Sequence, residues 1–177
     1  MNKFAMTAAT AALMLSLSAG ALAASGLGSV TTMSGAGAEA DKAGSVTINT
    51  TMCELELDDA GKIAAVSFDI AQNKVGFDAT GALTGELTGE HPTKKELGDG
   101  YGMKAASGIG KEWFEQVEAL EDWCVGKTVE EVVTMPTYDK GDGHHTQVPD
   151  DVDLKTGCTI DAGSFLDALQ KAADNAK

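Results

Sequence analysis

The residues best suited to chemistry lie near the end of the chain, in the run Asp153-Leu-Lys-Thr-Gly-Cys-Thr159. Residues 162–176 follow with apolar side chains at helical spacing, which predicts a C-terminal helix. We therefore expect Thr159 and Asp161 to lie at or just before a helix N-terminus, where free N–H groups and the helix dipole favour a phosphate. The hydroxyl of Thr159 is either an attachment point for a phosphate-bearing group or a cap for the helix, and Asp161 would serve as a cap equally well.

Two neighbouring histidines, His144 and His145, lie on a polar loop that also carries several aspartates. Adjacent histidines on a glycine-containing loop have no spacing that orients them toward one metal ion, so we predict a solvated loop without a metal. An exported enzyme that uses one of these histidines is another alternative. The sequence shows no second catalytic residue that would act together with the histidine.

The three cysteines, Cys53, Cys124 and Cys158, match no zinc-binding spacing. We expect small buried side chains, and the sequence leaves open whether two of them form a disulfide. The Val-Gly-Lys-Thr stretch at residues 125–128 is not a phosphate-binding P-loop, because that motif needs a glycine where this chain has Glu121.

Alternating apolar residues predict a β-hairpin over residues 45–70, with its turn in the sequence Asp58-Asp-Ala-Gly-Lys62. A third short strand is predicted at residues 73–78. The apolar positions change from one face to the other between Ile48 and Cys53, which predicts a bulge near Thr50 and Thr51.

A glycine-rich segment without periodicity, residues 79–110, separates this hairpin from the helices. Apolar residues at helical spacing predict an amphipathic helix over residues 111–125, and Thr128 with Glu131 forms a capping-box pattern for a short second helix. We expect Trp113 and Trp123 to serve the core. The predicted fold class is α+β: a small antiparallel sheet with a hairpin, packed against a central amphipathic helix and a C-terminal helix.

The N-terminal 23 residues have one early lysine, an apolar stretch and an Ala-x-Ala end, which is typical of a secretory signal peptide. Residues 24–44 are rich in glycine, alanine and serine and are predicted to be a flexible lead-in. Residues 45–177 are then a single domain, and we expect the protein to be secreted or extracytoplasmic, in the cell envelope.

The chain is strongly acidic, with 27 Asp and Glu against 13 basic residues and a net charge of −14. The predicted signal peptide carries only Lys3, so its removal leaves 12 − 27 = −15. Such a surface repels the phosphate backbone of nucleic acids and anionic membranes. We therefore expect neither a nucleic acid nor an anionic membrane as a partner. No stretch after the signal peptide has the roughly 18 apolar residues of a membrane span, so we expect no membrane-spanning segment there.

Several of these segments, in their order along the chain, resemble extracytoplasmic FMN-binding domains, such as the flavin-carrying subunits of the Rnf and sodium-pumping NADH:quinone oxidoreductase complexes. Residues 153–159 resemble the signature Asp-x-x-(Ser/Thr)-Gly-Ala-(Ser/Thr) of that family. Residues 59–69 are similar to its strand-turn-strand segment, and residues 108–128 to its Gly-rich lead, helix and Gly-Lys ending. Together the resemblance covers most of residues 46–173.

The resemblance implies that a flavin transferase joins the phosphate of FMN to the hydroxyl of Thr159, and that the protein carries electrons for a membrane redox partner. Asp153 matches the leading acid of the signature, Thr156 and Gly157 would form the bend that presents Thr159, and Cys158 stands where the family has alanine.

Two alternatives stay open beside this reading. A weaker match at residues 78–84 places Leu83 at the acceptor position, with Thr84 one residue late. The second alternative is a non-catalytic cell-envelope or secreted binding protein of the same fold without flavin. Such a protein would bind its ligand or partner through the glycine-rich segment 79–110.

Overall fold

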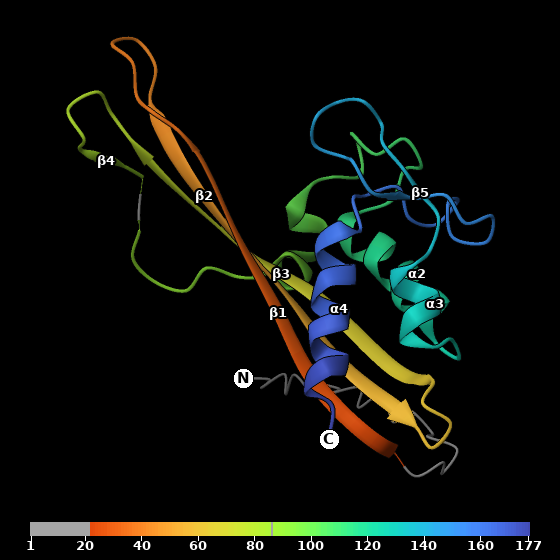
Figure 1. Cartoon of the computed structure of the whole chain (residues 1–177). Coiled ribbons are helices and arrows are strands. Elements are labelled where there is room, and N and C mark those ends of the chain that lie inside the picture. The colour runs from red at the N-terminus through yellow and green to blue at the C-terminus, as the bar shows by residue number, and fades with distance from the viewer. Residues whose placement is uncertain (1–21, 86) are drawn as a thin grey trace, which may run out of the picture.

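The structure is a computed structural model that describes residues 22–85 and 87–177. Its main feature is a four-stranded antiparallel sheet in the order β1-β2-β3-β4, formed by Leu22–Ala36, Gly44–Asp58, Ile63–Phe77 and Leu83–Thr84. The helices lie against one side of this sheet (Figure 1). They are α1 (Lys94–Leu97), the 3-10 helix η1 (Gly98–Tyr101), α2 (Trp113–Cys124), α3 (Val129–Val133) and α4 (Gly163–Asn175), and a two-stranded sheet joins β5 (Thr137–Tyr138) to β6 (Val148–Pro149). The predicted α+β class is confirmed.

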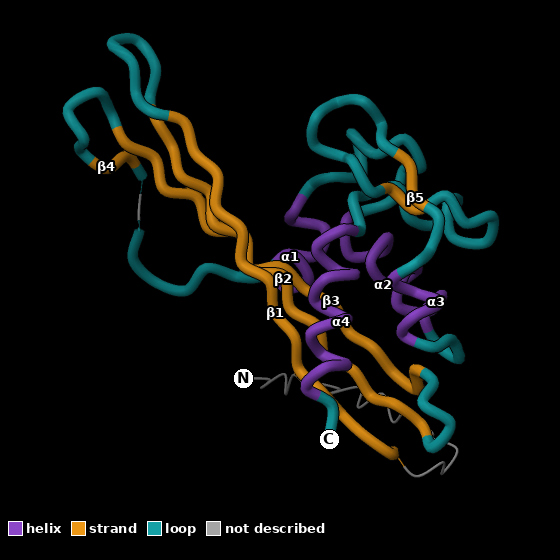
Figure 2. The backbone as a smooth tube through the Cα atoms, viewed as in Figure 1, coloured by secondary structure: helices purple, strands orange, loops and turns teal. Residues whose placement is uncertain are grey.

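The three long strands have 15 residues each, and the helices cover only part of their length. Figure 2 shows that the other part of the sheet projects away from the helices. We call this projection, residues 31–50 and 71–84, the arm. Within the described residues, no helix combines the length and the hydropathy that a bilayer crossing requires.

The predicted hairpin is confirmed, and its turn is held by one side chain. The Asp58 Oδ1 atom accepts hydrogen bonds from the backbone N–H groups of Ala60 and Lys62, both at 2.9 Å. Gly61 has a φ of 72°, a left-handed conformation that glycine adopts without the steric cost of a side chain. The sequence therefore determines this turn locally.

Two predictions about the strands are wrong. Residues 73–77 are not a separate strand but the end of β3, which runs without interruption to Phe77. The register between β2 and β3 is continuous at Thr50 and Thr51, and it shifts instead between Glu56 and Leu57, where Ala64 is the extra residue opposite. The apolar pattern changes face because Ile48 lies in the arm, where no helix covers the sheet, whereas Cys53 faces the helices.

The prediction of a flexible lead-in over residues 24–44 is also wrong for residues 24–36, which belong to β1. Strand β1 pairs with β2 along its length, from Ala24 opposite Leu57 to Ala36 opposite Ser45. Residues 37–43 turn at the tip of the arm, with an isolated bridge between Glu39 and Lys42. The predicted signal peptide, residues 1–23, falls almost entirely outside the described residues, and β1 begins near its predicted end.

Small residues in β1 allow α4 to approach the sheet closely. A Cβ atom built on Gly28 would overlap the carbonyl oxygen of Ala168 and lie 2.5 Å from the backbone nitrogen of Ala172. A Cβ on Gly26 would likewise overlap the carbonyl oxygen of Ala172. Glycine within a strand weakens the strand itself, but here it permits direct packing of the helix backbone on the sheet.

The core lies between the covered part of the sheet and helices α2 and α4. Phe68 of β3, Phe165 of α4 and Trp113 of α2 are buried and in contact, with ring centroids 5.2 Å apart for Phe68 and Phe165 and 6.1 Å for Trp113 and Phe165. Trp123 packs against this core while partly exposed. The amphipathic helix, the capping box of Thr128 and the C-terminal helix are all confirmed.

We expect the substitution Gly28→Ala to lower the free energy of unfolding by about 3 kcal/mol, because the added methyl group forces α4 away from the sheet. Gly108→Ala is the matched control, since no atom lies within 4 Å of a Cβ built there. Urea denaturation of the two variants and the wild type measures the difference. Equal midpoints for both variants would show that α4 shifts without cost.

Candidate functional site around Thr159

Thr159 lies on the segment between a tight turn and α4. The backbone N–H groups of Gly157 and Cys158 both donate to the carbonyl oxygen of Leu154, at 2.8 and 2.9 Å, and close the turn. Cys158 and Ile160, on either side of Thr159, are buried, whereas Thr159 itself is partly exposed. The two buried neighbours therefore anchor the segment and present Thr159 at the surface.

The side chain of Gln116, which is completely buried in α2, fixes the orientation of Thr159. Its Oε1 atom accepts hydrogen bonds from the Thr159 backbone N–H at 2.8 Å and from the Thr159 hydroxyl at 3.1 Å. Its Nε2 atom donates to the Ser107 hydroxyl at 3.1 Å and to the Lys111 carbonyl at 3.3 Å. Because both donors of the amide are engaged, Oε1 must face Thr159, and the Thr159 Oγ1 lone pairs point away from this bond.

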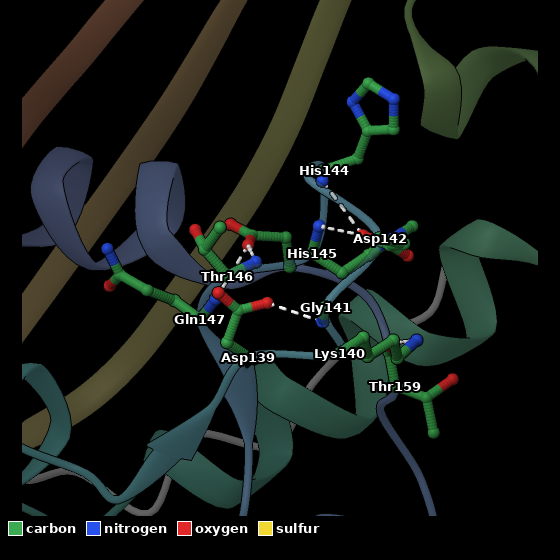
Figure 3. Close-up of polar contacts among 10 residues, drawn as sticks. Asp139, Lys140, Gly141, Asp142, His144, His145, Thr146, Gln147 and Thr159 are labelled. Carbon is green, nitrogen blue, oxygen red and sulfur yellow. Dashed lines mark hydrogen bonds and ion pairs between the residues drawn. The ribbon is translucent and has the colours of Figure 1, made fainter.

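Two lysines lie beside this segment. The Lys140 Nζ atom donates a hydrogen bond to the Thr159 carbonyl oxygen at 2.6 Å, and Figure 3 shows Lys140 next to Thr159. The Lys111 Nζ atom lies 3.9 Å from the place that a Cβ of Gly157 would occupy. In a chain with net charge −14, two ammonium groups beside one segment make the local charge more positive than the chain average.

Asp161, two residues before α4, is engaged by backbone groups. Its Oδ2 atom accepts from the N–H groups of Thr146 and Gln147 at 2.8 and 2.9 Å, and Oδ1 accepts from the Gly163 N–H at 3.0 Å. Asp161 therefore binds one N–H of the first turn of α4, and the Thr159 side chain caps nothing. The capping role considered for Thr159 is wrong, because its hydroxyl bonds to α2.

The other predicted site residues differ in their surroundings. Asp153 and Thr156 are exposed on the turn, and the side chains of both make no hydrogen bond within the described residues. Gly157 packs against α2, where an added Cβ would lie 3.0 Å from the Cβ of Ala119. Cys158 is buried, and its side chain is one sulfur atom larger than the alanine of the signature.

The residues around Thr159 suit the phosphate end of FMN. A phosphate ester on Oγ1 would carry negative charge, and Lys111 and Lys140 are the cationic side chains beside this segment. Thr159 is partly exposed, and its hydroxyl oxygen accepts no hydrogen bond within the described residues. A cavity lies elsewhere, beside the C-terminal half of α4, and neither Thr159 nor its neighbours line it.

The histidine loop is exposed and organised by Asp142. The Asp142 Oδ1 atom accepts from the backbone N–H groups of His144 and His145, both at 2.8 Å, and Oδ2 lies 2.6 Å from the His145 Nδ1 atom (Figure 3). These hydrogen bonds hold the pKa of Asp142 well below its usual range. No group of three or more His, Cys, Asp or Glu in the described residues could hold a metal ion.

The weaker signature match at residues 78–84 is a turn at the end of the arm. The Asp78 Oδ1 atom accepts from the Thr80 N–H at 2.8 Å, the Thr80 hydroxyl at 2.7 Å and the Ala82 N–H at 3.0 Å. These hydrogen bonds lower the pKa of Asp78 and account for the Asp-x-Thr-Gly pattern as turn chemistry.

Sequence reasoning did not identify Gln116, Lys111 or Lys140 as site residues. Gln116 is 43 positions from Thr159, and only the packing of the turn on α2 brings them together. A polar residue within the apolar stripe of the predicted helix was the available signal, because a buried amide needs partners.

Comparison with known proteins gives one partial relative. No family model matches the chain, and no solved structure matches it. A chlorophenol reductase of Desulfitobacterium hafniense is 38% identical over 96 residues, which are 48% of this chain and 29% of that protein. The chain thus spans less than a third of the length of this relative.

We expect Gln116→Leu to lower the free energy of unfolding by about 2 kcal/mol, because the Thr159 N–H and the Ser107 hydroxyl lose a partner in a partly buried setting. Gln170→Leu is the control, since Gln170 is exposed on α4 and its side chain donates to Asp174. Denaturant titration compares the two. A Gln116 variant as stable as the control would mean that Thr159 has no fixed orientation.

The three thiols should be inert toward thiol reagents in the folded protein. All three are free and buried, and burial raises the pKa of Cys53 and of Cys124 to about 12 and that of Cys158 to about 11. Because a raised pKa lowers the thiolate fraction, we expect slow alkylation at pH 8 and three labels after denaturation. Mass spectrometry counts the labels. Rapid labelling of Cys158 in the native protein would contradict its burial.

Proposed function

We propose that the protein is an exported electron carrier of the FMN-binding type, with FMN attached covalently through Thr159. The observation that carries this proposal is the geometry of Thr159, a partly exposed residue. Its hydroxyl is fixed by the buried Gln116, and its carbonyl accepts from the ammonium group of Lys140. The resemblance of residues 153–159 to the flavin attachment signature points to the same residue.

The residues of the site have separable roles in this proposal. Gln116 accepts the Thr159 hydroxyl hydrogen and so turns the oxygen lone pairs toward the surface, where a flavin transferase can reach them. Lys111 and Lys140 offset the charge of the phosphate ester. The bound FMN supplies one- or two-electron transfer, and no catalytic residue of the chain itself is required.

The named relative supports a redox role, since it is called a chlorophenol reductase. The similarity covers only part of that protein, so we propose for this chain electron transfer outside the cytoplasm with a membrane redox partner, and no reaction on a chlorophenol.

Flavin attachment is tested by Thr159→Ala, Thr159→Ser and Thr84→Ala, each coexpressed with a flavin transferase. We expect wild type, Thr159→Ser and Thr84→Ala to carry the added mass of FMN after denaturation and to fluoresce, and Thr159→Ala to carry none. The serine variant keeps the hydroxyl, and the Thr84 variant tests the weaker signature match.

Intact-mass spectrometry on the denatured proteins separates the outcomes. Loss of flavin from Thr84→Ala with retention by Thr159→Ala would move the attachment to the arm. A wild-type protein without covalent flavin, made with an active transferase, would contradict the proposal.

A binding protein without flavin is the second candidate, and a cavity favours it. The cavity has a volume of about 690 Å³ and lies at the edge of β1 and on the open face of the sheet, with Leu27, Met52, Glu54, Asp69 and Lys171 among its lining residues. The glycine-rich segment 79–110 does not line this cavity, so a binding function would use the sheet.

A further inference from the structure

One edge of the sheet has unpaired backbone groups in the arm. The Ser25 N–H and carbonyl bond to the backbone of Lys177, and the carbonyls of Leu27 and Ser29 accept from the side chains of Asn175 and Lys171. Because backbone groups of alternate residues point to the same edge, the N–H and C=O of Thr31, Met33 and Gly35 also point outward. Within the described residues these groups have no partner.

The unpaired edge also lacks the features that keep strand edges from pairing. Residues 24–38 contain no charged residue and no proline, in a chain with 27 acidic residues. The opposite edge is different, since β4 pairs with Gly76 and Phe77 of β3, and β3 carries Lys74. Like-charge repulsion between two copies of this acidic chain is therefore weakest along β1.

We propose that two copies of this chain pair through the β1 edge of the arm, antiparallel, with Met33 on the two-fold axis. An antiparallel edge is self-complementary under a two-fold rotation, as a symmetric dimer requires. The residue numbers of two positions that face each other across the axis then add up to 66. Thr31 lies opposite the partner's Gly35, and Met33 lies opposite the partner's Met33. The three outward-pointing residues of each copy exchange about six hydrogen bonds.

The pairing places the bulk of the two copies at opposite ends. The C-terminal part of the chain covers the β1 edge at residues 25–29. These residues would face residues 37–41 of the partner, so the partner's strand must leave the edge at its residue 37. The chain turns at these positions, in the tip of the arm, and a Cβ on Gly37 would meet no atom within 4 Å. The fold thus leaves room for each helical body beyond the tip of the other arm.

A basic side chain lies where the covered part of the edge ends. The Lys171 Nζ atom donates to the Ser29 carbonyl, and by the same sum Ser29 faces the partner's Gly37. Glu39 and Asp41 follow Gly37 in the tip, so the acidic tip of one copy lies near an ammonium group of the other.

The open face of the arm is apolar at the axis. Met33 is 74% exposed, and its neighbour across the pair with β2 is Ile48. In the dimer, Met33 of each copy packs beside the partner's Met33, and a single apolar strip runs across both arms. Side chains directly opposite on one face are the pairs that stabilise a sheet.

The test is the mass of the full chain, as the cell processes it, measured by light scattering after size-exclusion chromatography. We expect wild type at twice the monomer mass. Met33→Lys and Met33→Glu each place two like charges together on the axis, so we expect each alone to be monomeric, with a dissociation constant raised about tenfold or more. A 1:1 mixture of the two restores a dimer, because it pairs opposite charges.

Thr32→Lys is the matched control, since it adds the same charge on the other face of the arm and off the axis, and it should remain dimeric. Unchanged circular dichroism of all variants shows that the fold is kept. A monomeric wild type overturns the proposal, as do dimeric Met33→Lys and Met33→Glu variants. Failure of the mixture to pair, with both variants folded and monomeric, overturns the axis at Met33.

Discussion

The close approach of α4 to β1 is the constraint on which both ends of the molecule depend. The helix backbone packs directly on Gly26 and Gly28, with no room for a side chain between them. At one end of α4, a hydrogen bond from the Thr51 hydroxyl to the Ser164 hydroxyl ties the helix to β2 next to the Thr159 segment. At the other end, the chain terminus covers the β1 edge up to Ser29 and leaves the rest of that edge open.

A buried amide organises the candidate site. Gln116 lies in the apolar stripe of α2 and uses its nitrogen on the turn of Ser107 and Lys111 and its oxygen on the Thr159 segment. Removal of either segment would leave a buried polar group unpaired, so the segments are held together more firmly than surface contacts would hold them. Thr159 thereby gains a fixed hydroxyl although its own side chain is partly exposed.

The sequence predicted the elements that local chemistry determines. The Asp58 turn, the Thr128 capping box and the helices at residues 113–124 and 163–175 follow from nearby residues. Strand β1 was missed because its glycines look like a linker, and their reason lies in α4, more than 130 positions away. The pairing of Gln116 with Thr159 was missed for the same reason, since it exists only after the turn packs on α2.

Two carboxylates in the loops beside the Thr159 segment are engaged by backbone groups. Asp142 and Asp161 each accept hydrogen bonds from at least two backbone N–H groups, which stabilise their charged forms. The lowered pKa of Asp142 reflects this stabilisation of the charged form. Lys140 directs its ammonium group to the Thr159 carbonyl instead of to either carboxylate. The aspartates therefore shape the loops, and the ammonium group of Lys140 contacts the backbone of Thr159.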